Sequence, residues 1–186
     1  MNNNSLALIE FSKIAVGIET ADQILKTAAV EIVHSKFICP GKYSVLFAGS
    51  VSAVETALNS GLEIAKNKKA LVNHFLLANI NQQVKELLLK KRKKKDITDS
   101  LGILEYINIS STIQAADIAV KAAEVELLEL KLAMAIGGKG FVIFSGENEA
   151  CKQAIKAVES ALGNKHLISK ALISSPEPKL IAKILT

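Results

Sequence analysis

The segment 35–42 (Ser-Lys-Phe-Ile-Cys-Pro-Gly-Lys) contains the one side chain in the sequence whose setting suggests metal chemistry, Cys39. Pro40 presets its own φ and Gly41 tolerates a positive φ, so this pair predicts a tight turn with Cys39 at its tip. A cysteine thiolate is a ligand for zinc and for iron–sulfur clusters. No His, Cys or carboxylate stands beside it within the segment, and one cysteine cannot hold a metal centre. The segment could do this chemistry only where several copies of the chain converge.

No other set of side chains in the sequence predicts catalysis. His34, His74 and His166 are scattered and do not show the spacing of a metal site. The segment 137–140 (Gly-Gly-Lys-Gly) lacks the other positions of a phosphate-binding loop. We find no nucleophile beside a base and no pair of acids. The sequence therefore predicts a protein that is not an enzyme.

The net charge of +5 comes from one place in the chain. Lys90–Lys95 is a run of six basic residues, more than the whole net charge, so the rest of the protein is nearly neutral. Aromatic residues make up 4% of the chain and Trp is absent, which argues against stacking of bases or sugars as the main function. We expect a solvated linker at this tract. Docking on acidic cargo and nonspecific attraction of RNA are its alternatives.

The apolar share of 49% is enough for a packed core. The start of the sequence does not resemble a signal peptide, and no apolar run approaches the ~18 residues needed to span a bilayer. Two cysteines do not make a disulfide framework. We expect a soluble cytoplasmic chain without a membrane partner, in which a free thiol stays reduced.

The chain contains an internal repeat that covers nearly its whole length. Residues 5–11 (Ser-Leu-Ala-Leu-Ile-Glu-Phe) return at 100–106 as Ser-Leu-Gly-Ile-Leu-Glu-Tyr. A repeat of ~95 residues is too long for a solenoid and predicts two small domains in tandem. We place the first domain at 4–88, a basic linker at 89–98 and the second domain at 99–186. The repeat aligns Cys151 with Val54 in a helix, so Cys151 is predicted to be a core residue.

Each repeat has the pattern β-α-β-β-α-β, which predicts an α+β fold: a ferredoxin-like domain with helices on one face of an antiparallel sheet. In the first repeat strands are expected at 6–11, 30–33, 43–48 and 74–78, with 167–173 as the counterpart of the last. The first helix is expected to bury one apolar face. The residues of that face are Ile14, Ile18, Ala21, Leu25 and Ala28, with Ile109, Ile113, Ala116, Val120 and Ala123 as their counterparts.

The second helix of the first repeat is expected to begin near Ser52. Ser52 with Glu55, three residues later, resembles a capping box. Beyond it, apolar and small residues recur at helical spacing and predict the face that packs on the sheet. The residues of this face are Val54, Ala57, Leu58 and Gly61.

Both repeats carry an acid and a lysine four residues apart in their first helix. These pairs are Asp22 with Lys26 and Asp117 with Lys121. The i, i+4 spacing predicts an ion pair on one helix face, and such a pair at a solvated surface contributes little to stability. Few other polar residues are shared between the repeats, which also makes these lysines candidates for contacts with a neighbouring subunit.

The residues shared by the two repeats resemble those of the bacterial microcompartment shell domain. The resemblance lies in segments 8–10, 21–31 and 49–54 and in their counterparts 103–105, 116–126 and 146–150. Two such domains in one chain resemble the tandem-domain shell proteins. That family implies a homotrimer shaped as a pseudohexamer, a flat tile that joins other shell proteins edge to edge around an enzyme core. It also implies that Lys26 and Lys121 lie at tile edges.

The Cys39 segment is similar to that of the iron–sulfur-binding shell proteins of propanediol-utilisation compartments. The resemblance implies that Cys39 of three subunits meets at the central pore and binds one [4Fe-4S] cluster per trimer. One of the four irons would then lack a cysteine ligand and take water, a small molecule or another protein's side chain. The residues expected to line the pore are Ile38, Pro40, Gly41, Ile136, Gly137 and Gly138.

The leading hypothesis is therefore a shell protein of a bacterial microcompartment that passes electrons across the shell, with a redox cargo enzyme as a further partner. An iron-free pore for a small metabolite, with Cys39 only lining it, is the alternative. A nucleic-acid-binding adaptor that uses Lys90–Lys95 is a third hypothesis, although no specific RNA-binding motif accompanies that tract. A ligand-sensing regulator would need a polar cleft between subunits, and the sequence offers no polar cluster to build one.

Overall fold

The computed structural model describes residues 5–89, 100–132 and 138–184. The chain divides into two compact units, Met1–Ile80 and Asn81–Thr186. Helix α3 (Gln82–Leu88), which the sequence places in the first domain, thus belongs with the second unit. The basic tract Lys90–Lys95 lies outside the described residues.

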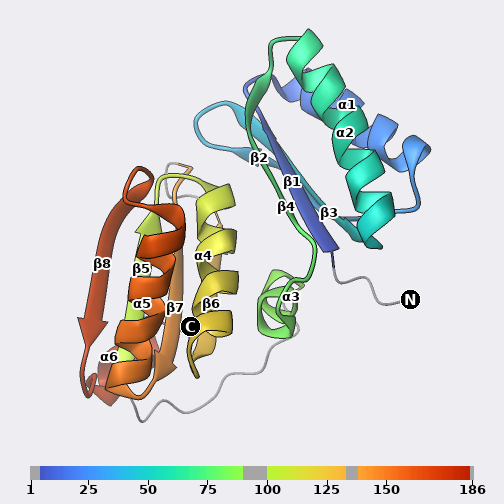
Figure 1. Cartoon of the computed structure of the whole chain (residues 1–186). Helices are drawn as coiled ribbons and strands as arrows, with labels where there is room; N and C mark the ends of the chain where they lie inside the picture. Colours follow the sequence, from blue (N-terminus) through green and yellow to red (C-terminus); the bar gives the residue numbers. More distant parts are fainter. Residues whose placement is uncertain (1–4, 90–99, 133–137, 185–186) are drawn as a thin grey trace. The chain divides into compact units, whose positions relative to one another are not determined.

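The first unit is a four-stranded antiparallel sheet with two helices on one of its faces (Figure 1). The sheet has the order β2-β3-β1-β4, so the two central strands are the first and third in sequence. Its elements are β1 (Ser5–Phe11), α1 (Ile14–Thr27), β2 (Glu31–Ile38), β3 (Lys42–Gly49), α2 (Val51–Asn67) and β4 (Leu71–Leu77).

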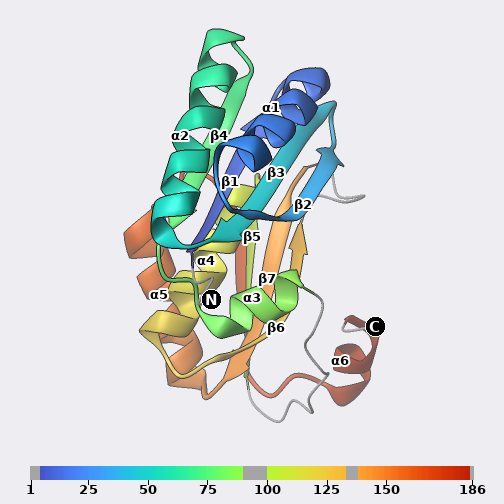
Figure 2. The same cartoon turned by 90° about the vertical axis from the view of Figure 1, so that its right-hand side faces the viewer.

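The second unit repeats this architecture with the strand order β6-β7-β5-β8. It also contains α3, which packs on α4 and β6, and a short final helix, α6 (Figure 2). The prediction of two ferredoxin-like α+β domains is confirmed. The elements are β5 (Ser100–Tyr106), α4 (Ile109–Ala122), β6 (Glu126–Leu132), β7 (Gly140–Gly146), α5 (Asn148–Leu162), β8 (Leu167–Ile173) and α6 (Pro178–Ile184).

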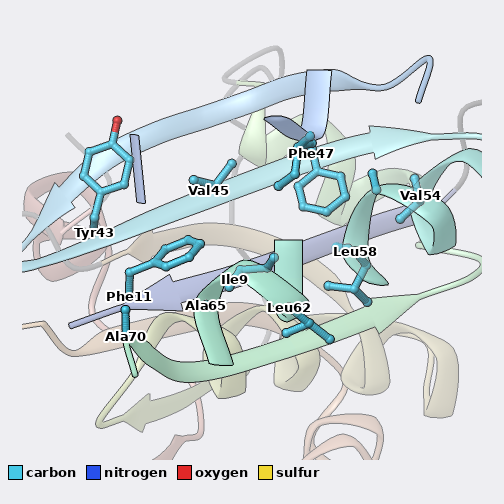
Figure 3. Packing of buried hydrophobic residues seen from close by; sticks show 13 residues of the cluster. Ile9, Phe11, Tyr43, Val45, Phe47, Val54, Leu58, Leu62, Ala65 and Ala70 are labelled. Carbon is cyan, nitrogen blue, oxygen red and sulfur yellow. The ribbon is translucent and has the colours of Figure 1, made fainter. Parts of the chain in front are cut away.

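The core of the first unit lies between its sheet and its two helices (Figure 3). Alternate residues of β1 and β3 point into it, as the two-residue period of a strand requires. On α2 the core residues recur at helical spacing, and all four predicted positions, Val54, Ala57, Leu58 and Gly61, are buried. Most side chains in this cluster are aliphatic or Ala, which lets the helices lie close to the sheet.

The face predicted for burial on α1 is right for Ala21 and Ala28, which pack half-buried against the core, and wrong for its large residues. The buried residues of α1 are Gly17, Thr20 and Ile24, whereas Ile18 and Leu25 are 50% and 52% exposed. The helix turns its smallest residue to the sheet, because the ring of Tyr43 occupies that space. Thr20 can be buried because its hydroxyl donates to the Val16 carbonyl at 2.7 Å.

The corresponding face of α4 is buried over most of its length. Ile109, Ile113 and Ala116 are at most 2% exposed, and Val120 and Ala123 are half-buried. The prediction therefore holds over most of the face in the second repeat and fails for the large residues in the first. An apolar pattern at helical spacing does not by itself show which face of a helix packs on its own sheet.

The predicted capping box of α2 is also wrong. Ser50, not Ser52, is the N-cap, and its hydroxyl accepts from the Ala53 N–H at 3.3 Å. Ser52 lies inside the helix, one turn before Thr56. Ser50 directly follows the last residue of β3, so the helix begins as soon as the strand ends.

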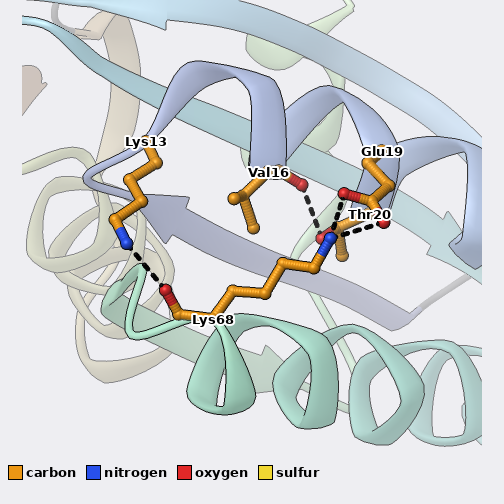
Figure 4. A network of polar contacts seen from close by, with 5 residues as sticks. All are labelled: Lys13, Val16, Glu19, Thr20 and Lys68. Carbon is orange, nitrogen blue, oxygen red and sulfur yellow. Dashed lines mark hydrogen bonds and ion pairs between the residues drawn. The ribbon is translucent and has the colours of Figure 1, made fainter.

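Polar contacts join α1 to the end of α2 (Figure 4). Lys68 extends its ammonium to Glu19 Oε1 at 2.7 Å, and its carbonyl accepts from Lys13 Nζ at 2.8 Å. These side chains are exposed, so the pairs contribute little stability. The position of α1 is set instead by its packing, since Gly17 lies against Tyr43 of the strand that follows the Cys39 turn.

Candidate functional site at the Cys39 hairpin

Cys39 lies at the tip of the hairpin formed by β2 and β3. Ile38 pairs with Lys42 across the hairpin, so Cys39, Pro40 and Gly41 make a three-residue turn. Gly41 has φ +61°, the left-handed region in which glycine is favoured, and the Cys39–Pro40 peptide bond is cis. The predicted tight turn is present, with an exposed free thiol at its tip.

The turn presents only some of its predicted pore residues to solvent. Cys39, Pro40 and Gly41 are exposed, whereas Ile38 is only 4% exposed. Ile38 therefore anchors the base of the turn in this chain. The groups available to a partner at the tip are the thiol and the surfaces of Pro40 and Gly41.

Aromatic contacts support the hairpin behind the tip. Phe37 and Tyr43 face each other across the two strands, with ring centroids 5.4 Å apart in an edge-to-face arrangement. The Tyr43 hydroxyl is hydrogen-bonded to Ser35 Oγ at 2.8 Å, which ties β3 to β2 a second time. Phe37 itself is 67% exposed, an unusual position for a large aromatic side chain. The hairpin is thus built rigidly up to Cys39.

His34 on β2 is neutral at ordinary pH. Burial, and secondarily the charge of Lys36, lower the pKa of His34 to about 4. Its Nε2 lies 3.1 Å from Ser44 Oγ on the paired strand. His34 therefore serves as an uncharged hydrogen-bonding partner inside the hairpin.

A single chain does not assemble a metal site in the part that the structure describes. Within residues 5–89, 100–132 and 138–184, no group of three His, Cys, Asp or Glu side chains could hold a metal ion. Cys151 is fully buried in α5, with Sγ 3.7 Å from the Ser100 carbonyl, so its predicted place in the core is confirmed. Cys39 is left as the thiol that other copies of the chain could approach.

The second-repeat loop predicted to join Cys39 at the pore is described only in part. Ile136 and Gly137 lie outside the described residues. Gly138 is half-buried and has φ +83°, in the region that favours glycine. The next residue, Lys139, places Nζ 3.3 Å from Glu105 Oε1, which connects this loop to β5.

Both predicted i, i+4 ion pairs are confirmed, but their surroundings differ. In the first repeat Lys26 Nζ lies 2.5 Å from Asp22 Oδ2, and both side chains are more than 60% exposed. In the second, Lys121 makes the same contact at 2.5 Å, yet the Asp117 side chain is only 3% exposed. Both lysines are thus partly open to solvent, while one of the two carboxylates is covered.

Asn81 makes this difference, and its role was not predicted from the sequence. The Asn81 N–H donates to Asp117 Oδ1 at 2.7 Å. Asn81 is also the N-cap of α3, since its side chain accepts from the Gln83 N–H. An Asn before a helical run is a recognisable N-cap signal, but the side on which such a short helix docks depends on tertiary contacts.

The family of the chain is decided by a domain that occurs in it twice. The model of the BMC domain matches residues 5–80 and again 100–176. The chain belongs to the BMC-domain family. Over 96% of its length it is 31% identical to the bacterial microcompartment shell protein PduT of Citrobacter freundii, and it covers 96% of that protein. The predicted family is therefore confirmed for both repeats.

Solved structures show the same architecture. A microcompartment protein from Desulfitobacterium hafniense has a TM-score of 0.87 and 36% identity, with 96% of this chain and 98% of that one covered. The fused permuted hexameric shell protein MSM0275 of the RMM microcompartment has a TM-score of 0.61 and 25% identity, with 87% and 85% covered.

The family assigns the chain its general role and place. It is a structural shell protein with tandem BMC domains, located in a bacterial microcompartment. Among the described residues, every helix is too short or too polar to span a bilayer.

Proposed function

We propose that three copies of this chain form a shell tile whose central pore holds a [4Fe-4S] cluster on three Cys39 thiolates. The tile passes electrons across the shell, to or from a redox cargo enzyme, and joins other shell proteins at edges that include Lys26 and Lys121. The exposed thiol at the tip of a well-supported hairpin is the observation that carries this proposal.

The exposed face of α1 supports the association of several copies. Ile18 and Leu25 are about half exposed, although Ile113 at the position equivalent to Ile18 is fully buried. A surface that one repeat buries and the other leaves open needs a cover from another molecule. Two domains per chain and a threefold axis then give six similar positions in a closed ring.

The residues at the turn fit a cluster in their donor chemistry. One thiol per chain supplies three thiolates at a threefold axis, which leaves the fourth iron for water, a small molecule or another protein's side chain. The turn places the thiol beyond the buried Ile38. Lys36 and Lys42 flank it in the sequence, and their positive charges favour an anionic cluster.

When bound, the cluster supplies reversible one-electron transfer. The chain's own residues position the thiol and limit its movement. The Phe37–Tyr43 contact and the Tyr43–Ser35 hydrogen bond hold the hairpin behind Cys39. His34, uncharged at neutral pH, adds no further positive charge to the base of the turn.

Anaerobically purified protein tests both parts of the proposal. Sedimentation should give three times the chain mass of 19.9 kDa. Chemical analysis should give about four irons and four sulfides for three chains, with an EPR signal after reduction. Cys39→Ser should lose the iron and keep the trimer, and Cys151→Ser is the matched control that keeps both.

Other results separate the alternatives. An iron-free trimer that binds a small metabolite would favour the iron-free pore and contradict the cluster. A chain that sediments as a monomer at all concentrations would contradict the tile itself.

A further inference from the structure

Helix α3 shows how a short terminal helix docks on a BMC domain. Within the second unit it packs on α4 and β6 and buries Val84 completely. Its N-cap N–H reaches Asp117, as described above. Gln83 bridges the backbone of β6: its Nε2 donates to the Val125 carbonyl at 3.3 Å, and its Oε1 accepts from the Leu127 N–H at 2.9 Å.

The equivalent surface of the first unit is open in the chain. The repeat aligns Asp22 with Asp117 and Ile32 with Leu127. The Asp22 side chain is 62% exposed, against 3% for Asp117. Ile32 is half-buried, whereas Leu127 is fully buried. The first unit thus has the carboxylate acceptor, Asp22, and the strand, β2, on which a helix could dock. Within the chain no helix is docked there among the described residues.

Helix α6 is the counterpart of α3 in the second repeat. Each helix begins five residues after the last residue of its edge strand. Leu180 stands at the position of Val84 and Ile184 at that of Leu88. Leu180 is 45% exposed and Ile184 is 37% exposed, and no residue of α6 is buried. The apolar face of α6 therefore lacks the cover that α3 has.

We infer that α6 of one copy docks on α1 and β2 of a second copy, as α3 docks on α4 and β6. In this contact the Glu177 N–H donates to Asp22. Glu177 is the counterpart of Asn81, and the donor in both cases is the backbone N–H, which does not depend on the side chain. Lys179, at the position of Gln83, would lie above the exposed Glu31 and adds an ion pair that α3 does not make.

The order of the elements points to a second copy as the partner. Helix α3 follows the first repeat in sequence and docks on the repeat that comes after it. If α6, which follows the second repeat, also docks on the next repeat, that repeat is the first one of another chain. Each chain then donates one α6 and receives one, so the contact is head-to-tail and closes into a ring. The inference rests on the proposed trimer and specifies its contact.

Cross-linking tests this contact directly. In a Cys39→Ser background, chains that carry both Lys26→Cys and Glu177→Cys, which leave Asp22 in place, are treated with a short bismaleimide. We expect covalent products of more than one chain in denaturing gels. Asn81→Cys with Lys121→Cys is the matched control, which should cross-link within one chain because the Asn81 N–H and Lys121 Nζ both contact the Asp117 carboxylate, which this pair leaves in place.

Each outcome decides the inference. A link between positions 26 and 177 of the same chain, or no link where the control pair reacts, would overturn it. Links between chains in an assembly that does not sediment as a trimer would uphold the α6 contact and contradict the proposed tile. Links between chains within a trimer uphold both.

Association should weaken when the apolar face of α6 is removed. Leu180→Ser with Ile184→Ser should raise the dissociation constant of the assembly roughly 10- to 100-fold, since two side chains lose their burial. Ala182→Ser changes an exposed residue of the same helix and should leave it unchanged. An unchanged dissociation constant in the double variant would overturn the contact, even if the protein remains a trimer.

Discussion

Tyr43 of β3 lies against the backbone of Gly17 in α1, so closely that a Cβ at Gly17 would be 2.6 Å from Tyr43 Cδ1. In the second repeat the larger residue of this pair is on the helix and the glycine is on the strand. Thr112 takes the place of Gly17 and Gly140 the place of Tyr43, and a Cβ at Gly140 would lie 2.4 Å from Thr112 Oγ1. The larger residue sits on the strand only in the repeat that carries Cys39. There the Tyr43 ring supports the hairpin.

Gly17→Ala should destabilise the first unit. Alanine in place of a helical glycine normally adds up to about 1 kcal/mol, but here the Tyr43 ring must move, and overpacking costs about 1–3 kcal/mol. We expect a lower midpoint in urea unfolding. Ala15→Gly, at an exposed position of α1, measures the effect of helix propensity alone. A Gly17→Ala protein more stable than the wild type would show that Tyr43 can be displaced without cost.

Tyr106→Phe should leave stability unchanged or raise it by about 1 kcal/mol. The Tyr106 hydroxyl is buried and has no hydrogen-bond partner among the described residues, and an unsatisfied buried polar group is costly. The first repeat has Phe11 at this position, also fully buried. The reverse change, Phe11→Tyr, is the matched test and should lower the unfolding midpoint.

The same variant should change the alkaline behaviour. Burial, and secondarily Glu159, raise the pKa of Tyr106 from 10.0 to about 12. The unfolded chain therefore ionises first, and stability falls as pH rises from 10 towards 12. Tyr106→Phe should reduce this fall in denaturation measured across that range. An identical pH dependence in both proteins would contradict the raised pKa.

Acid should destabilise the Cys39 hairpin through His34. Its pKa is about 4 in the folded protein and near 6.5 when unfolded, so the unfolded chain binds the proton first. Stability is unaffected above about pH 6.5, falls as pH drops towards about 4 and loses about 3 kcal/mol in all. His34→Gln should flatten the curve between these values. His74→Gln removes an exposed imidazole and is the control.

The sequence predicted the topology because the repeat allowed each element to be read twice. Strand 167–173 was placed with the bounds that β8 has in the structure. The four predicted core positions of α2 were also right, since that face of the helix packs on the sheet and on α1 of its own unit. Strands and core positions that depend on packing within one domain could therefore be predicted from the sequence.

The errors have one physical origin. Ile18 and Leu25 formed the strongest apolar stripe of α1, yet a glycine faces the sheet, because close approach to a tyrosine ring leaves no apolar signal. The role of Asn81 was missed for a similar reason, since docking of α3 depends on Asp117, 36 residues away. Sequence periodicity identifies an apolar helix face, but it does not show what that face packs against.

Asp117→Ala should destabilise the second unit far more than Asp22→Ala destabilises the first. Loss of Asp117 leaves the half-buried Asn81 N–H without its acceptor, at a cost of about 1–3 kcal/mol. The Asp22–Lys26 pair is exposed and contributes less than about 1 kcal/mol. Hydrogen exchange of α3 in the two variants measures the difference. Equal protection of α3 in both would contradict the role of Asp117.

Lys26→Ala and Lys121→Ala should impair sheet assembly without changing the tile. Lys26 belongs to an exposed ion pair, so its removal costs the single tile little stability. Lys121→Ala also removes the counter-ion of the covered Asp117 carboxylate, so the unfolding midpoint of that variant is measured alongside. At an edge between tiles each ammonium would lose contacts that recur along the whole sheet. We expect trimers of unchanged mass that no longer form extended sheets in electron micrographs. Lys152→Ala removes an exposed lysine of α5 and should still form sheets. Sheets of normal extent in the double lysine variant would show that the tile edges lie elsewhere.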